Sequence, residues 1–361
     1  MKTFPFIYNQ PKDFVKSLQP GEWAEFLLSE INPKLSLTTI KAKVVKITEE
    51  TADTKTFVLN PNWLWKGFSA GQHLPVTVEI AGRNVTRFYS LSSSPNEKLI
   101  SITVKRQKGG LVSNFLNEKV KVGDILQLGK PSGEFTVGES APKSLLFLAG
   151  GSGITPIHSI LKKLESSQYK GKATLLYFVR TSADIILKSS LEKIQEKNQF
   201  LKIQYILSDE KKEGYDSGFL TDEIVHKYVP NLEGVSVYVC GPGPMQQKAL
   251  TLFPNNPIKS ELFLLPTQIQ NPVKKEGTVE VTLSLSHKTI QLKGEKSLLD
   301  ELEEQGIFPQ SGCRMGICHT CVCKKTSGLV TDLSNGEKSE LGEENIQLCV
   351  SRAENALELE L

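Results

Sequence analysis

Alternating apolar and polar residues mark the first large part of the chain. Six short runs with this pattern follow one another between turn residues: 40–47, 54–59, 73–80, 84–91, 99–106 and 124–129. A period of two places every second side chain on the same face of a strand. Six strands at this spacing predict an antiparallel β-barrel or sandwich.

After Pro142 the pattern changes to longer apolar runs alternating with helical stretches. The apolar runs are 144–150, 173–179, 201–207 and 235–241. Strands that are apolar throughout, separated by helices, are typical of a parallel sheet covered on both faces. The sequence therefore predicts an α/β unit after the barrel.

A third unit follows a polar link. A hairpin is predicted from the runs 278–285 and 288–294, and a helix is predicted from Leu298 to Gln305. Ser297 is the expected N-cap of this helix and Gly306 its stop. Together these elements predict an α+β, β-grasp-like fold.

The predicted organisation has five segments. They are an N-terminal helical extension (1–38), the barrel (39–141), the α/β unit (142–265), a linker (266–276) and the C-terminal unit (277–361). In the extension, an apolar helical face runs from Trp23 to Ile31. It is expected to pack on the protein itself, with contact to a partner or a membrane as the alternative.

Composition places the chain among soluble globular proteins, with 39% hydrophobic and 23% charged residues in 361. It contains no run of about 18 apolar residues that would span a membrane, and no apolar leader follows the N-terminus. A cytoplasmic location is expected, and no nucleic-acid partner.

Four C-terminal cysteines have the spacing of an iron–sulfur site. Cys313, Cys318 and Cys321 form C-x4-C-x2-C, and Cys349 follows at a distance. This is the plant-type 2Fe-2S spacing, in which four thiolates hold two irons. A structural zinc site is the alternative, although zinc usually takes paired C-x2-C knuckles. Cys323 is interpreted as a buried residue that is not a ligand.

Two short motifs in the barrel have phosphate-binding chemistry. In the segment Arg87-Phe88-Tyr89-Ser90, alternation places Arg87 and Tyr89 on one face, where a cation and an aromatic ring can receive a phosphate and a planar ring. Downstream, a Gly-rich turn enters a helix at 109–114, and its backbone N–H groups can bind an anion.

The α/β unit carries two further motifs. Its first strand leads into G-x-G-x-x-P at Gly151, Gly153 and Pro156, with Thr155 as the expected helix cap. Such a turn suits a dinucleotide pyrophosphate. Its last strand ends in the segment 240–245, Cys-Gly-Pro-Gly-Pro-Met.

These motifs, in this order, resemble the ferredoxin-NADP reductase superfamily, followed by a plant-type ferredoxin domain over residues 277–361. The resemblance implies an antiparallel flavin barrel, a nicotinamide-binding α/β domain and a 2Fe-2S domain. The Pro131 to Phe135 segment is similar to the FAD-binding members rather than to the FMN-binding phthalate-dioxygenase-reductase branch. FAD, a 2Fe-2S cluster and NAD(P)H are therefore the expected cofactors.

The resemblance also implies residue roles. Arg87 would meet the flavin phosphate, and Tyr89 and Ser90 the isoalloxazine. The remaining cofactor contacts are assigned to Gly110, Val112 and Ser113 for the flavin pyrophosphate, and to Gly151, Gly153, Thr155, Arg180, Gly241 and Pro242 for the nicotinamide nucleotide. Ser90 and Cys240 are the candidate catalytic residues, with Cys240 beside the nicotinamide C4.

The choice between NADH and NADPH rests on a few charges. Arg180, with Lys211 and Lys212, favours NADPH, whereas Asp209 would repel a 2′-phosphate. On balance the sequence favours NADPH.

The resemblance implies a reductase that passes single electrons to an acceptor. The N-terminal part is most similar to electron-transfer partners of membrane fatty-acyl desaturases and hydroxylases, so such an acceptor is expected, with transient association at the membrane surface through it. One alternative is the reductase of a soluble ring-hydroxylating or other oxygenase. A zinc-stabilised interaction module is the alternative from another class.

Overall fold

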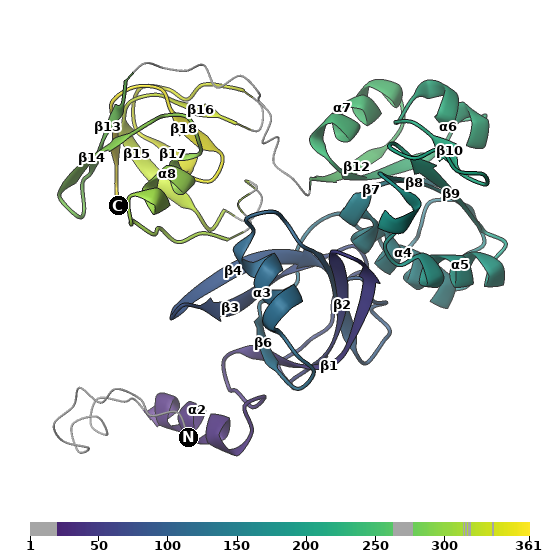
Figure 1. The fold of residues 1–361 in the computed structure, drawn as a ribbon, viewed down its shortest axis with the longest axis horizontal. Helices are drawn as coiled ribbons and strands as arrows, with labels where there is room; N and C mark the ends of the chain where they lie inside the picture. Colours follow the sequence, from purple (N-terminus) through teal and green to yellow (C-terminus); the bar gives the residue numbers. More distant parts are fainter. Residues whose placement is uncertain (1–19, 263–276, 313, 315, 317–318, 334–335) are drawn as a thin grey trace.

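The computed structural model describes residues 20–262, 277–312, 314, 316, 319–333 and 336–361. Within them, three units follow one another along the chain, each built on its own main sheet (Figure 1). The first is an antiparallel barrel, the second a parallel sheet with helices, and the third a smaller mixed sheet. The predicted fold class is confirmed.

The barrel is built from six strands of the described chain. They are β1 (Ile40–Thr51), β2 (Thr54–Pro61), β3 (His73–Ile80), β4 (Arg83–Ser90), β5 (Ile100–Lys105) and β6 (Ile125–Leu128). Their order is β4-β3-β6-β1-β2-β5, and neighbours are antiparallel. A bridge from Leu91 to Ile102 joins the two edges and closes the barrel. Helix α3 (Leu111–Lys119) adds Leu116 to the barrel core.

The second unit is a parallel sheet in the order β10-β9-β8-β7-β11-β12. Its strands are β7 (Ser144–Gly150), β8 (Lys172–Val179), β9 (Leu201–Leu207), β10 (Asp216–Ser217), β11 (Ser236–Gly241) and β12 (Ile258–Leu262). Its helices are η1 (Gly151–Gly153), α4 (Ile154–Ser166), η2 (Ser182–Asp184), α5 (Lys188–Lys197), α6 (Asp222–Tyr228) and α7 (Gly243–Leu252). Helices α4 and α5 cover one face and α6 and α7 the other (Figure 1).

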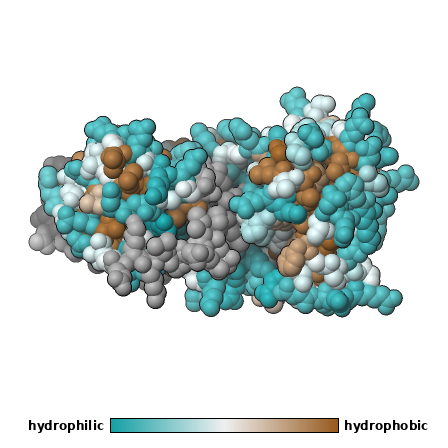
Figure 2. Space-filling model, turned by 90° about the horizontal axis from the view of Figure 1, so that it is seen from above, coloured by the Kyte–Doolittle hydropathy of each residue, from teal (hydrophilic) through white to brown (hydrophobic). Residues whose placement is uncertain are grey.

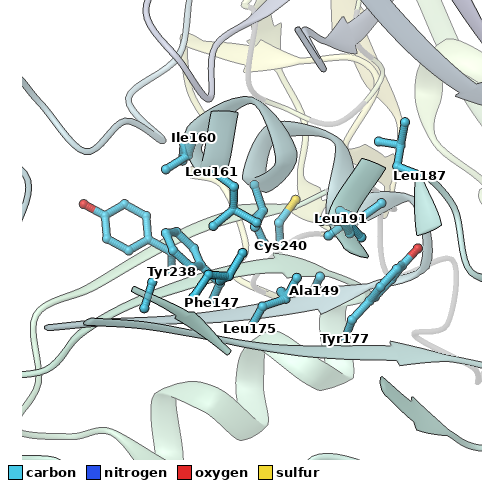
Figure 3. Close-up of a cluster of buried hydrophobic side chains, with 14 of the residues drawn as sticks. Phe147, Ala149, Ile160, Leu161, Leu175, Tyr177, Leu187, Leu191, Tyr238 and Cys240 are labelled. Carbon is cyan, nitrogen blue, oxygen red and sulfur yellow. The ribbon is translucent and has the colours of Figure 1, made fainter. Parts of the chain in front are cut away.

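Strand β7 shows why the central strands are apolar throughout. Phe147 and Ala149 face the core under α4 and α5 (Figure 3), whereas Leu146 and Leu148 face the core under α6 and α7. Because both faces of a covered parallel sheet are buried, alternation disappears from the sequence. The long apolar runs were the correct signal for this architecture.

Side chains from the segment after the barrel pack in the core of the second unit. Phe135 and Val137 are buried in the core under α4, and the Phe135 ring meets Tyr238 edge to face at 5.6 Å. A side chain at Gly71 would come 1.9 Å from the Phe135 carbonyl oxygen. Barrel and parallel sheet are therefore joined by a shared core, although the predicted boundary lies after residue 141.

The C-terminal unit has a main sheet in the order β14-β13-β19-β15-β17 and a small sheet of β16 and β18. Its elements are β13 (Val279–Leu283), β14 (Lys288–Leu292), α8 (Leu298–Glu304), β15 (Val322–Ser327), β16 (Val330–Asp332), β17 (Glu344–Gln347), β18 (Ser351–Ala353) and β19 (Leu357–Leu359). The predicted hairpin is β13 with β14. As predicted, the Ser297 hydroxyl accepts a hydrogen bond from Asp300 N at the start of α8.

Helix α2 (Pro20–Ile31) forms where the apolar spacing predicts it. Its apolar face is not buried as expected, because Phe26, Leu27 and Ile31 are 47%, 55% and 78% exposed. Glu25 ties the helix to the start of the barrel by accepting a hydrogen bond from Leu37 N. None of the helices in the described residues is long and apolar enough to cross a membrane. On the face shown in Figure 2, hydrophobic side chains (brown) gather in two separate areas, each surrounded by hydrophilic ones (teal).

Candidate active site

The end of β4 brings the predicted flavin residues together. Arg87 and Tyr89 are both half-buried, and Arg87 donates to the Thr86 carbonyl at 2.7 Å. Burial and the nearby Arg314 lower the pKa of Arg87 to about 10, so the guanidinium is still charged at neutral pH. Burial raises the pKa of Tyr89, whose ring packs against the barrel core. A fixed cation and a neutral phenol therefore lie on the same face, as predicted.

Ser90 completes this group, and its hydroxyl is a buried polar group. Its side chain is 2% exposed, and its hydroxyl has no hydrogen-bond partner among the described residues. A buried polar group without a partner costs about 1–3 kcal/mol. Such an orphan fits a bound group with a polar edge, and a flavin has one. This observation supports the assignment of Ser90 to the cofactor site.

The Gly-rich turn lies before α3. Gly109 has a φ of 75°, and a side chain at Gly110 would come 2.6 Å from the Ser113 hydroxyl. Gly110 is the N-cap and provides no side-chain cap. The Val112 side chain is buried in the barrel core, so only its backbone N–H is available to a phosphate. The turn fits the pyrophosphate that the resemblance implies.

The dinucleotide turn differs from prediction at its cap. Helix α4 begins at Ile154 with Gly153 as its N-cap, and no side chain caps it. The Thr155 hydroxyl instead donates to the Ser152 carbonyl at 3.0 Å. The predicted cap at Thr155 was therefore wrong, because the hydroxyl stabilises the preceding 3-10 turn rather than the helix end. The Ile154 amide donates to the Gly151 and Ser152 carbonyls and Pro156 has no N–H, so these two positions of the first turn offer no donor to an anion.

The two motifs of the parallel sheet meet at the carboxyl ends of β7 and β11. A side chain at Gly153 would come 2.0 Å from the Cys240 carbonyl oxygen, and one at Gly150 would come 2.7 Å from Pro242. Cys240 is fully buried, and burial, with Glu261 nearby, raises the pKa of its thiol well above the usual value. It lies in the core with Ala149 and Leu161 (Figure 3). Ligands of open α/β sheets bind at this edge.

Two residues that the sequence interpretation missed join the barrel to this edge. His73 Nδ1 lies 2.7 Å from Glu261 Oε1, and both side chains are buried. His73 pairs with Ser90 across β3 and β4, and Glu261 pairs with Cys240 across β12 and β11. Glu261 Oε2 is buried with no partner among the described residues. The only sequence signal was a carboxylate within an apolar run near residue 260.

Arg180, which is predicted to lie at the adenosine end of the nucleotide, is more exposed. Arg180 Nε donates to Asp209 Oδ2 at 2.8 Å, and the Arg180 side chain is 79% exposed. Hydrogen bonds from Ser208 and Arg180 lower the pKa of Asp209. Arg180 therefore stands beside a carboxylate that already neutralises it.

Two of the four predicted cluster ligands are described. Cys321 and Cys349 are both buried in the core of the C-terminal unit, and Leu348 N donates to the Cys321 carbonyl at 3.1 Å. Cys313 and Cys318 lie outside the described residues. Two buried cysteines on adjoining segments are a donor set that suits an iron–sulfur cluster.

The C-terminal unit lies against the β4 side of the barrel. Arg314, within the cysteine loop, donates to Asp300 at 2.9 Å and also pairs with Glu303. Arg314 is close enough to act on the charge of Arg87. The guanidinium of Arg83 on β4 lies 4.0 Å above the Phe308 ring. Arg314 and Phe308 of the C-terminal unit thus lie near the β4 residues that are proposed to bind the flavin.

Fold and site together define a flavin- and nucleotide-binding reductase with an iron–sulfur domain. Models of three families match in the same order: an oxidoreductase FAD-binding domain (residues 41–137), an oxidoreductase NAD-binding domain (147–250) and a 2Fe-2S iron-sulfur cluster binding domain (281–354). Each match lies within one of the predicted segments.

Known proteins are similar to this chain along most of its length. The ferredoxin reductase component of 3-ketosteroid-9-alpha-monooxygenase from Mycobacterium tuberculosis is 31% identical, covering 80% of this chain and 83% of the relative. One component of the 1,2-phenylacetyl-CoA epoxidase from Escherichia coli is 30% identical, covering 81% and 88%. The structure of phthalate dioxygenase reductase shares the fold, with a TM-score of 0.66 and 23% identity over 90% of this chain and 98% of that one.

The chain belongs to the family of FAD- and NAD(P)-binding reductases that carry a C-terminal 2Fe-2S ferredoxin domain. It is an NAD(P)H-dependent oxidoreductase of the ferredoxin-reductase type, with FAD and a 2Fe-2S cluster as cofactors.

Proposed function

We propose that this protein is the reductase component of an oxygenase system, which carries electrons from NAD(P)H to a separate oxygenase. The observation that supports it most is the similarity, at 30–31% identity over most of the chain, to the reductase component of a monooxygenase and to one component of an epoxidase. This acceptor was the alternative in the sequence interpretation, and the comparisons support it better than a desaturase.

When bound, FAD and the 2Fe-2S cluster would supply the redox chemistry, which is the acceptance of a hydride from NAD(P)H and the release of single electrons. The chain supplies position and exclusion of water. We propose that Arg87 holds the flavin phosphate, Tyr89 and Ser90 contact its ring, and the amides of Gly110, Val112 and Ser113 meet its pyrophosphate.

The nicotinamide nucleotide is assigned to the parallel sheet, at the carboxyl ends of β7 and β11. The amides at Gly151, Gly153 and Thr155 would hold its pyrophosphate, and Gly241 and Pro242 would border its nicotinamide end. Cys240, whose thiol stays protonated because burial raises its pKa, would provide a small neutral wall there. Cys313, Cys318, Cys321 and Cys349 are the proposed cluster ligands.

We further propose NADH as the preferred donor, against the balance of charges in the sequence. The Asp209 carboxylate pairs with Arg180 at 2.8 Å, which offsets the positive charge that a 2′-phosphate needs. A carboxylate at the adenosine end accepts hydrogen bonds from ribose hydroxyls and repels a phosphate. This arrangement supports NADH.

A membrane desaturase or hydroxylase stays a second candidate acceptor because α2 exposes Phe26, Leu27 and Ile31. Such a helix suits transient contact with a membrane-bound partner. A cytoplasmic location fits either candidate. The test is coupled turnover: the holoprotein and NADH are mixed with purified soluble oxygenases or with a desaturase in membranes, and product is measured. Product only with the desaturase would overturn the primary proposal.

A further inference from the structure

Tyr177 on β8 connects the turn at Gly151 to Ile186, which follows the short helix η2. Its hydroxyl donates to the Gly151 carbonyl at 2.9 Å and accepts from Ile186 N at 3.2 Å. We infer that Tyr177 is a positioning residue for nicotinamide-nucleotide binding, which fixes the Gly151 turn without touching the nucleotide. This inference rests on the proposed assignment of that turn to the nucleotide pyrophosphate.

The hydroxyl is held firmly in place. Tyr177 is fully buried and among the largest fully buried side chains of the described residues. It lies in the core beside Leu187 and Leu191 (Figure 3). Burial raises the pKa of its hydroxyl, which therefore remains a donor throughout the physiological range. Its two hydrogen bonds join the turn to residue 186.

The orientation of the Gly151 peptide explains why this matters. Gly151 has a φ of 53°, in the left-handed region, and its carbonyl also accepts from Ile154 N at the start of α4. In a trans peptide the carbonyl and the following N–H point in opposite directions. With the carbonyl directed to Tyr177, the Ser152 N–H, which lies between the assigned amides of Gly151 and Gly153, points away from the core, the direction needed to receive an anion.

Through Ile186 and its neighbour Leu187, the Tyr177 hydroxyl also links this turn to the barrel. Leu187 N donates to Glu50 Oε2 at 3.2 Å, and Glu50 Oε1 accepts from Thr56 at 2.7 Å. Glu50 and Thr56 belong to β1 and β2, and Leu187 follows the residue that Tyr177 holds. A continuous path of hydrogen bonds and chain therefore runs from the barrel to the nucleotide turn.

Tyr205 offers a matched control. It is the register partner of Tyr177 on β9, with ring centroids 6.1 Å apart. Its hydroxyl is also buried but has no partner among the described residues. The change Tyr205→Phe removes the same atom from the neighbouring strand without breaking a hydrogen bond seen in the structure.

The test compares Tyr177→Phe, Tyr205→Phe and wild type as FAD-loaded holoproteins. Calorimetry measures the affinity for ADP-ribose, which carries the pyrophosphate but no nicotinamide, and steady-state kinetics measure KM and kcat for NADH with ferricyanide. Y177F should weaken ADP-ribose binding and raise KM by roughly 5- to 20-fold, with kcat within about twofold and FAD content unchanged. Y205F should match wild type in all four.

Equal ADP-ribose affinity in Y177F and Y205F, with normal wild-type binding, would overturn the positioning role alone. A wild-type protein that neither binds ADP-ribose nor oxidises NADH or NADPH would overturn the proposed function itself. If Y177F does not fold, Glu50→Gln carries the test by weakening the contact at Leu187. It should raise the KM for NADH by about two- to fivefold, and an unchanged KM would reject the inference.

Discussion

The imidazole of His73 and the carboxylate of Glu261, 188 positions apart in the chain, meet in a buried hydrogen bond of 2.7 Å. The bond joins β3 of the barrel to β12, an edge strand of the parallel sheet. His73 also packs edge to face on Phe88 at 5.5 Å, and Gly133 passes close to its ring. Two domains are therefore held together at the place where both cofactors are expected to meet.

The change His73→Ala should destabilise the holoprotein. It leaves the buried carboxylate of Glu261 without its imidazole partner, which should cost about 1–3 kcal/mol of unfolding free energy. Chemical denaturation followed by flavin fluorescence measures this. His226→Ala is the control, since His226 pairs with Asp222 at 3.2 Å on the exposed surface. Equal stability of the two variants would show that the buried pair contributes nothing.

The change Cys318→Ser should separate two activities. A serine hydroxyl is a poor ligand for iron, so the cluster should be lost. Reduction of ferricyanide, which can accept electrons from flavin, should stay near the wild-type rate, whereas reduction of cytochrome c should fall at least about tenfold. Loss of both activities in a folded, FAD-loaded variant would contradict a modular path.

Cys323→Ser is the control for that experiment. The Cys323 sulfur makes only weak contacts with the Lys324 and Glu360 carbonyls at 3.6 Å, and burial raises its pKa to about 11. Iron content and the visible spectrum should stay unchanged. Loss of half the iron or more would mean that Cys323, and not one of the four assigned cysteines, is a ligand.

Acid should weaken the fold through His158. Its Nδ1 donates to the Ser92 carbonyl of the barrel at 2.6 Å, Nε2 lies 2.8 Å from the Ser190 hydroxyl, and burial lowers its pKa to about 4. The unfolded chain takes up this proton near pH 6.5, so this stabilising contribution is complete above pH 6.5 and declines as the pH falls toward 4. The full loss is about 3 kcal/mol.

The measurement is unfolding free energy against pH for wild type and His158→Gln. Glutamine can keep both hydrogen bonds but does not titrate, so the difference between the two curves should change between pH 6.5 and 4. Parallel curves over that interval would show that His158 is not the responsible group.

The change Asp209→Ser should shift coenzyme preference. It frees Arg180 for a 2′-phosphate, so the ratio of kcat/KM for NADPH to that for NADH should rise about tenfold. Glu213→Ser, on an exposed residue of the same loop, should leave the ratio unchanged. A wild-type enzyme that already prefers NADPH would reject the proposed role of Asp209.

Local patterns were enough to predict the six barrel strands and four strands of the parallel sheet, because alternation and long apolar runs report directly whether one face or both faces of a strand are buried. In the five-stranded C-terminal sheet they predicted only the hairpin of β13 and β14. The cap of α8 was also predictable, because the contact is local: Ser297 and Asp300 are three residues apart. The cap of α4 was not, since the Thr155 hydroxyl had a competing acceptor in the turn before it.

The residues that complete the site were harder to find. His73 and Glu261 have no local motif, and only the docking of two domains makes them neighbours. The exposed face of α2 has a similar explanation, since periodicity predicts an amphipathic helix but does not say what covers it. Long-range pairing and domain contacts are therefore the part that one sequence does not reveal.

Phe135 and Val137 fill the core beneath α4, although in the sequence they lie between the last barrel strand and the first strand of the parallel sheet. A recombination event that joined a foreign nucleotide-binding module at residue 142 would keep Phe135 and Val137 but pack them into a core with other side chains, which would cause overpacking or cavities. Exchange among genes should therefore transfer residues 39–262 as one inherited block. Natural hybrids in this family are expected to carry their junctions elsewhere, between the nucleotide-binding sheet and the cluster domain.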